Sequence, residues 1–183
     1  EDIEERPSFS PNQCDYGMTI SYKERLLKSA YERFKNQKRP SNEYETFCQS
    51  NADWLDDFVL FIVMKRKYNG VVWSEWPEEL CNRQKESLNR IVAEYKDELE
   101  SGKFSQYIFF KQWELFKAYC NSCGIQLIGD IPIYVNYDSA DVWTNTSVFK
   151  LEKNQQPAFV AGVPPDYFSQ TGQLWGNPVY RWD

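Results

Sequence analysis

The last 24 residues are the part of the sequence that most constrains what the chain can fold into. They read VAGVPPDYFSQTGQLWGNPVYRWD and combine the tandem pair Pro164 and Pro165 with three glycines and several aromatic rings. Proline fixes its own φ at about −65° and lacks a backbone donor, whereas glycine adopts angles that other residues avoid. Because residues 160–183 show neither helical nor strand periodicity, the sequence predicts a shaped loop here. Loops of this kind often carry function.

Composition narrows the classes of function. The 183 residues have a formal net charge of −6, which gives no basis for binding nucleic acid or an anionic membrane surface. No apolar run approaches the roughly 20 residues of a membrane span, and the N-terminus is acidic and polar, unlike a secretory signal. The chain contains no histidine, which excludes Ser-His and Cys-His catalysis and histidine-ligated zinc within these residues. Carboxylates remain the main candidates for chemistry.

The five cysteines form an odd number, which favours reduced thiols and a cytoplasmic location over a disulfide framework. Cys120 and Cys123 have the spacing of a redox or zinc pair, but no second pair accompanies them, so packing at a helix end is favoured. Asp53, Asp56 and Asp57 are expected to lie on a solvated helix face rather than around a cation. We therefore expect no metal and no cofactor.

Residues 1–20 are expected to be an extended lead-in, and residues 21–124 show helical periodicity. Ser21 is a plausible cap of the first helix, with Glu24 placed for a capping box, and Trp73 and Trp76 are expected to pack inside the helical region rather than bind sugar. The predicted helices are 21–36, 43–68 in two pieces broken near 49–51, 77–100 closed by 101–102, and 104–123 with Gly124 as its C-terminal cap.

Residues 125–135 follow this glycine and read IQLIGDIPIYV, a nearly continuous apolar run that is typical of a parallel strand covered on both faces. Asp130 interrupts the run. It is either a structural strand-end carboxylate or, in a (β/α)₈ barrel, a carboxylate of the active site. In both cases we expect it to have a partner, because a buried unpaired charge costs several kcal/mol.

Two further elements are expected after this strand. Asp138, Ser139 and Asp141 indicate the start of a helix with Ser139 as its N-cap. Residues 149–151 and 158–160 flank a polar turn and predict a hairpin that supports the C-terminal loop.

Three stretches resemble one enzyme family: GIQLIGDIPIYV, DSADVW at 138–143, and the C-terminal run at 160–183. They are similar, nearly residue for residue, to amylomaltase or 4-alpha-glucanotransferase (disproportionating enzyme), within the α-amylase-like barrel enzymes. NADWLDDFVLFIVMK, WSEWPEEL and FFKQWELFKAYCNSCGI are weaker matches. The resemblance implies an α/β fold: a partial (β/α)₈ TIM barrel with an inserted, mainly α-helical subdomain at 21–124. Residues 125–183 would supply a barrel strand, the hairpin and a substrate-covering loop.

The implied activity is the transfer of α-1,4-glucan segments between maltodextrins by a retaining double displacement. The family places its nucleophile Asp in an Arg-x-Asp-His run, followed by an acid/base Glu and a His-Asp pair. The chain has no histidine, so we expect an internal fragment that is inactive alone, with the nucleophile and the acid/base group beyond Asp183. Its expected partners are α-1,4-glucans and the remainder of the parent polypeptide. Asn136 and Tyr137 depart from the family, where a small residue and a histidine are expected.

The resemblance also assigns roles to particular residues. Asp130 matches the family's first active-site carboxylate, which supports the catalytic arginine and the reacting sugar. The substrate-binding positions are Asp166, Tyr167, Phe168, Gln173 and Trp175. Three alternatives stay open: a loop folded on its own rings, a non-catalytic glucan-binding module, and a helical interaction scaffold. A lone barrel strand at 125–135 would expose two edges, so we expect it to pair with another chain or to be poorly ordered.

Overall fold

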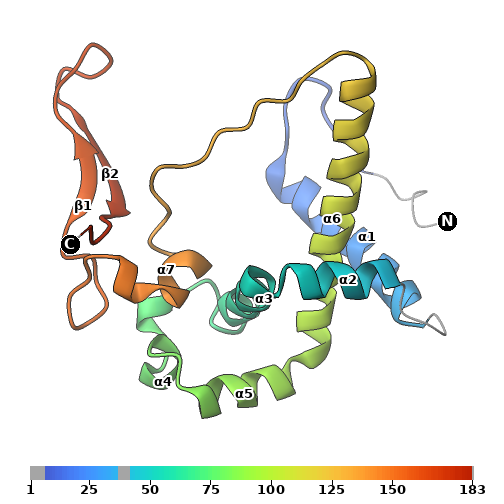
Figure 1. The fold of residues 1–183 in the computed structure, drawn as a ribbon, viewed down its shortest axis with the longest axis horizontal. Helices are drawn as coiled ribbons and strands as arrows, with labels where there is room; N and C mark the ends of the chain where they lie inside the picture. Colours follow the sequence, from blue (N-terminus) through green and yellow to red (C-terminus); the bar gives the residue numbers. More distant parts are fainter. Residues whose placement is uncertain (1–6, 37–41, 183) are drawn as a thin grey trace.

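The computed structural model describes residues 7–36 and 42–182. Helices make up most of these residues, and a two-stranded sheet stands to one side of them (Figure 1). The elements in chain order are α1 (Tyr16–Lys35), α2 (Asn42–Ser50), α3 (Ala52–Lys67), η1 (Trp73–Glu75), α4 (Glu78–Cys81), α5 (Lys85–Glu94), α6 (Lys96–Ser122), α7 (Ala140–Thr144), η2 (Thr146–Val148), β1 (Val160–Val163) and β2 (Gln173–Pro178).

The first helix, α1, begins earlier than the sequence predicted. Asp15 is its N-cap, and the Oδ1 atom of Asp15 accepts a hydrogen bond from the backbone N of Met18 at 2.9 Å. Ser21 therefore lies inside the helix, and the predicted capping box with Glu24 is wrong. The extended lead-in is limited to residues 7–15 of the described chain, and residues 1–6 lie outside it.

The predicted break in the second helical stretch is confirmed, because Asn51 separates α2 from α3. The predicted stop of α3 is confirmed too, since Asn69 and Gly70 adopt φ of 51° and 79°. α3 is buried around most of its circumference and forms the centre of the main core. Trp73 and Trp76, which are 0% and 4% exposed, pack into this core, as expected.

The predicted helix at 77–100 is divided into α4, α5 and the first turn of α6. Ser101 and Gly102 do not close a helix, because α6 continues through them for 27 residues in all. The reason lies in packing: a Cβ on Gly102 would lie 3.1 Å from Cγ1 of Val59, so glycine lets α6 approach α3 closely. At the far end Gly124, with φ of 75°, ends the helix as predicted.

Residues 125–135 form no strand, so that prediction is wrong for this structure. The segment runs without regular structure from the end of α6 toward α7 (Figure 1), and Ile128, Ile131 and Ile133 are 96%, 85% and 78% exposed. A buried parallel strand needs neighbouring strands on both edges and cover on both faces. The described residues supply neither, and the partial (β/α)₈ barrel is not confirmed.

The C-terminal run is a β-hairpin rather than an irregular loop. β1 pairs with β2 in antiparallel register, with Gly162 opposite Leu174 and an irregularity between Val160 and Gly162. The tip at 164–172 keeps the irregular path that its prolines and glycines predicted, and residues 179–182 follow β2 outside any strand. The sequence missed the strands because their side chains do not alternate between buried and exposed. Asp183, the last residue of the predicted loop, lies outside the described residues.

The predicted smaller turn is present beside the hairpin, but residues 149–151 form isolated bridges rather than a strand, and Val160 belongs to β1. Leu151 and Pro157 form an isolated antiparallel bridge around the tip of this turn. At its base Phe149 bridges to Tyr180, and Lys150 donates its backbone N–H to the carbonyl oxygen of Val179 at 2.8 Å. In the part of the chain that the structure describes, no helix combines the length and the apolarity needed to cross a membrane.

Candidate functional site

Asp130 lies in the middle of the segment 125–135, and its side chain is exposed. Among the described residues, no hydrogen bond or ion pair to this carboxylate is present. The expectation that Asp130 has a partner is therefore wrong here, and so is its burial in a strand. An exposed carboxylate keeps its solvation and needs no countercharge.

Asp166 organises the tip of the hairpin. Its Oδ1 atom accepts hydrogen bonds from the backbone N–H groups of Phe168 at 2.9 Å and Ser169 at 2.8 Å. The backbone N–H of Asp166 donates in turn to the carbonyl oxygen of Ser169 at 2.9 Å. These bonds make an Asx turn, which fixes the backbone around the next two side chains.

Those two side chains, Tyr167 and Phe168, point into solvent. They are 97% and 87% exposed, and their rings meet edge to face with centroids 5.5 Å apart. The alternative in which the loop folds on its own rings is thus not what the structure has. Two large exposed rings beside a carboxylate could bind a ligand that offers both apolar faces and hydroxyl groups, as a sugar does.

Gln173 and Trp175 lie on β2, between the tip and the base of the hairpin. The Oε1 atom of Gln173 accepts a hydrogen bond from Nε1 of Trp175 at 3.2 Å, which orients a ring that is 46% exposed. Tyr134 meets the Trp175 ring edge to face at 6.1 Å and stacks on Tyr180 at 5.9 Å. Tyr134 and Tyr180 were missed from the sequence. The position of Tyr134, four residues after Asp130, was the available signal.

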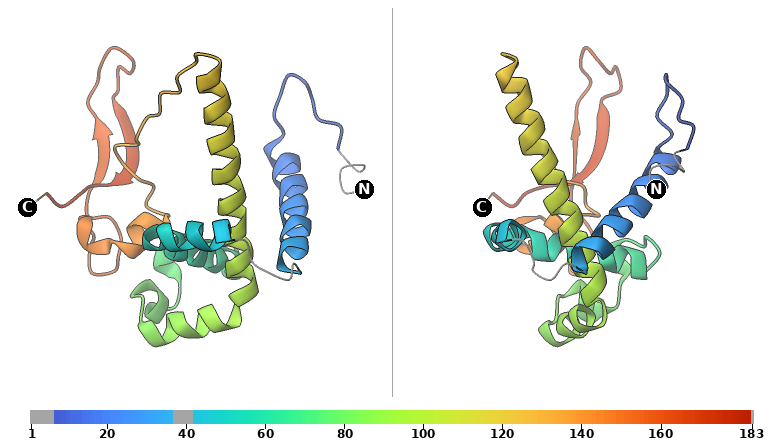
Figure 2. Two further views of the ribbon diagram at one scale, coloured as in Figure 1. Left: turned by 45° about the vertical axis from the view of Figure 1, so that its right-hand side comes forward. Right: turned by 90° about the vertical axis from the view of Figure 1, so that its right-hand side faces the viewer.

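The structure brings some of the predicted residues together and leaves others apart. Asn177, two residues after Trp175 on the same strand, donates from Nδ2 to the carbonyl oxygen of Val135 at 2.9 Å, so β2 lies against the end of the segment that carries Asp130. The tip at 164–172 lies at the end of the hairpin that is far from α3 and α7 (Figure 2). No described contact joins Asp130 to the tip residues.

The catalytic pair was predicted to lie beyond Asp183, at positions that the described residues, 7–36 and 42–182, do not include. Asp183 itself is also outside these ranges. The location of the nucleophile and of the acid/base carboxylate therefore stays a prediction, and the site described here consists of binding positions and Asp130.

Of the two groups of possible metal ligands, the aspartates of α3 are mostly engaged in ion pairs, whereas the cysteines near the end of α6 are free. Asp56 pairs with Lys103 at 2.6 Å and Asp57 with Arg83 at 2.5 Å, so two of the three neighbouring carboxylates take part in ion pairs. No group of three or more metal-ligating side chains occurs within residues 7–36 and 42–182. At the end of α6 the two cysteines differ in burial and both are free thiols: Cys120 is buried and Cys123 is exposed.

Comparisons with known proteins identify the same family that the sequence motifs resemble. A sequence profile described as 4-alpha-glucanotransferase matches residues 1–183. The 4-alpha-glucanotransferase of Aquifex aeolicus is 45% identical over 175 residues, which are 96% of this chain and 35% of that protein. The 4-alpha-glucanotransferase of Thermus thermophilus is 41% identical over 98% of this chain and 36% of that protein.

A solved structure is similar over the same extent. The amylomaltase from Streptococcus agalactiae, in complex with acarbose, superposes with a TM-score of 0.89 at 37% identity, covering 96% of this chain and 36% of that one. The chain therefore spans about a third of the length of these relatives. Because the family profile matches the sequence from end to end, the chain belongs to the 4-alpha-glucanotransferase family.

Proposed function

We propose that this chain supplies glucan-binding surface to a 4-alpha-glucanotransferase, which transfers α-1,4-glucan segments between maltodextrins with retention of configuration. The single observation that carries the proposal is the hairpin tip. Its Asx turn presents the carboxylate of Asp166 and the exposed rings of Tyr167 and Phe168 together. The acarbose bound to the structural relative supports a sugar as the ligand.

In this proposal the binding surface has two parts. Tyr167 and Phe168 offer apolar ring faces to glucose units, and Asp166 accepts hydrogen bonds from their hydroxyl groups. Gln173 and Trp175 lie nearer the base of the hairpin and contact the glucan beyond the tip. Asp130 stands at the reacting sugar as a supporting carboxylate.

Double displacement needs a nucleophile and an acid/base carboxylate that lie about 5 to 5.5 Å apart. We assign both groups to residues beyond Asp183, in the remainder of the parent polypeptide. We further propose that residues 125–135 become a strand of a (β/α)₈ barrel when neighbouring strands are present, with the helical residues 21–124 as an inserted subdomain. The five free thiols support a reducing, cytoplasmic setting.

Glucan binding is tested by titrating the chain with maltoheptaose and following tryptophan fluorescence. The expected result is a saturable change that Trp175→Ala removes. Trp113→Ala is the matched control, because Trp113 on α6 is 43% exposed, close to the 46% of Trp175, but lies outside the candidate site. A titration without any change in the wild-type chain would refute the proposed surface.

An activity assay distinguishes the proposed role from two others, that of a self-sufficient enzyme and that of a non-catalytic module. The chain alone is expected not to convert maltotriose into longer maltodextrins, whereas the parent polypeptide is expected to do so. Conversion by the chain alone would show that its own carboxylates suffice. Absence of transfer in the parent polypeptide, with glucan binding retained, would favour the binding module.

A further inference from the structure

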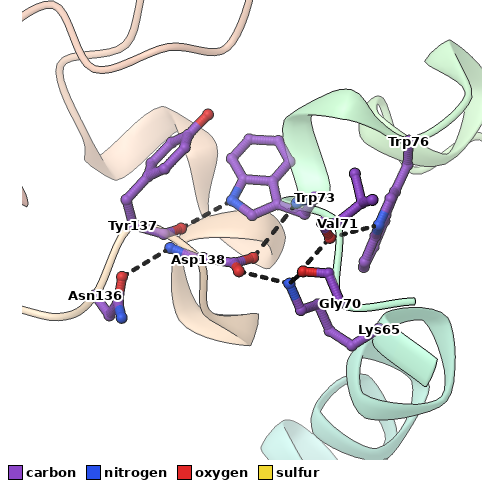
Figure 3. A network of polar contacts seen from close by, with 8 residues as sticks. All are labelled: Lys65, Gly70, Val71, Trp73, Trp76, Asn136, Tyr137 and Asp138. Atoms are coloured by element: carbon purple, nitrogen blue, oxygen red, sulfur yellow. Dashed lines mark hydrogen bonds and ion pairs between the residues drawn. The ribbon is translucent and has the colours of Figure 1, made fainter. Parts of the chain in front are cut away.

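Lys65, in the last turn of α3, is the centre of a polar network (Figure 3). Its Nζ atom donates to the carbonyl oxygens of Gly70 at 2.6 Å and Val71 at 2.9 Å, and to Oδ2 of Asp138 at 2.5 Å. An ammonium group has three donors, so all of them are used. The side chains of Lys65 and Asp138 are only 20% and 30% exposed.

The network continues on the other side of Asp138. Its backbone N–H donates to Oδ1 of Asn136 at 3.0 Å, and its Oδ1 accepts from the backbone N of Trp73 at 3.4 Å. Nε1 of Trp73 donates to the carbonyl oxygen of Tyr137 at 2.8 Å, and the two rings pack with centroids 5.4 Å apart. Residues 136–138 are thereby attached to the turn between α3 and η1.

The same corner also holds the base of the hairpin. Val135, directly before it, accepts the hydrogen bond from Asn177 of β2 at 2.9 Å, and the hydroxyl of Tyr137 donates to the carbonyl oxygen of Gln155 at 2.7 Å. Three parts of the chain therefore meet here: the helical region, the segment that carries Asp130, and the strand that carries Trp175.

We propose that Lys65 and Asp138 are positioning residues. They fix residues 135–138 on the helical region and so hold the Asp130 segment and the base of β2 in one arrangement. Their consequence for glucan transfer rests on the proposed function, but their structural role does not. Removing the ammonium would leave the carboxylate of Asp138 and the carbonyls of Gly70 and Val71 without this donor, and a partly buried charge without its partner is strongly unfavourable.

The structural role is tested in this chain by amide hydrogen exchange. Lys65→Met is expected to speed exchange at 135–138 and 175–177 by about tenfold, through local opening of the corner. Lys103→Met is the matched control, since Lys103 is 21% exposed, pairs with Asp56 at 2.6 Å and lies away from the corner. Asp138→Asn keeps the shape of the side chain and replaces Lys65→Met in this test if Lys65→Met fails to fold. Equal exchange at 135–138 in these variants and in the control would overturn the proposal.

The functional consequence is tested in the parent polypeptide. Lys65→Met and Asp138→Asn are expected to lower kcat for glucan transfer on the order of tenfold, because small misplacements of a reacting group reduce rate steeply. KM is expected to rise as well, because the base of β2 with the binding residue Trp175 loosens with the same corner. Lys103→Met is expected to keep kcat. If the wild-type polypeptide transfers no glucan, the proposed function fails while hydrogen exchange still decides the positioning role. If kcat falls equally in the control, Lys65 has only a general effect on stability and the positioning role is wrong.

Discussion

Two glycines of the hairpin show how surroundings, rather than backbone angle alone, fix the identity of a residue. Gly172 and Gly176 have similar φ, at 75° and 80°. A Cβ on Gly172 would lie 2.6 Å from the carbonyl oxygen of Val163, whereas a Cβ on Gly176 would have nothing within 4 Å. Glycine is therefore required at 172 by both the positive φ and the close approach of the backbone, whereas at 176 it is required by the positive φ alone.

We expect Gly176→Ala to lower the free energy of unfolding by about 1 kcal/mol, the usual strain of alanine at positive φ. Gly172→Ala is expected to lower it by at least about 2 kcal/mol, since backbone atoms must also move. Urea unfolding measures both values. Equal losses would show that the close approach of Gly172 to Val163 contributes nothing.

Tyr44 provides a second test at the residue scale, through pH. Burial raises the pKa of its phenol above the ordinary value, and the charge of nearby Glu100, whose Oε2 accepts the hydroxyl hydrogen at 3.0 Å, raises it further. The unfolded tyrosine ionises at about pH 10 while the folded one keeps its proton. This contribution to stability is therefore complete below about pH 10 and falls as the pH rises further.

Tyr44→Phe is accordingly expected to lower the free energy of unfolding by about 1 kcal/mol at neutral pH, through the lost hydrogen bond. The difference from the wild type should shrink above about pH 10, where the wild type loses stability. Unfolding curves between neutral and alkaline pH measure it. Tyr16→Phe, at a ring that is 74% exposed, controls for general alkaline effects. A difference that grows with pH would contradict the assigned direction.

At the scale of elements, the crossing of α3 and α6 depends on Gly102. Alanine favours a helix over glycine by about 1 kcal/mol. However, its Cβ would lie 3.1 Å from Val59, a β-branched side chain that is 2% exposed and has little room to move. We therefore expect Gly102→Ala to lower the free energy of unfolding by about 1 kcal/mol despite the gain in propensity.

A double-mutant cycle tests this explanation. In a Val59→Ala background the crowding is removed, so Gly102→Ala is expected to stabilise the chain by about 0.5 to 1 kcal/mol. Thermal or urea unfolding of the four proteins gives the coupling. The same effect of Gly102→Ala in both backgrounds would show that contact with Val59 is not what requires the glycine.

At the scale of the whole molecule, an exposed apolar band runs along the second half of α6 and into residues 125–133. It includes Leu115 and Tyr119, which are 66% and 67% exposed, as well as Ile128 and Ile131. Soluble monomers rarely leave extensive apolar surface open to water. We therefore expect the isolated chain to self-associate, with this band at the contact.

Light scattering as a function of concentration measures this association. Ile128→Lys combined with Ile131→Lys is expected to shift the chain toward monomer. Val92→Lys is the control, because Val92 is 43% exposed but lies on α5, outside the band. A wild-type monomer with strong amide protection across 125–135 would contradict both the association and the open state of this segment.

The sequence by itself determined the features that depend on near neighbours in the chain. The break at Asn51, the stop at Gly70 and the cap at Ser139, whose Oγ accepts from Val142 N at 3.3 Å, follow from local backbone preferences and short-range hydrogen bonds. The sequence also marked the residues of the hairpin tip as candidate binding positions, through the resemblance of their motif to the family. Whether they bind glucan stays a prediction.

Tertiary structure decided whatever depends on contacts between distant residues. Gly102 continues a helix because α3 packs against it, and β1 and β2 become strands because they pair with each other. Residues 125–135 form no strand because the described chain offers them no neighbour. The bond from Lys65 to Asp138 joins residues 73 positions apart, a pairing that no local pattern indicates. Strand pairing and ion pairs are properties of two surfaces brought together, and only the fold brings them together.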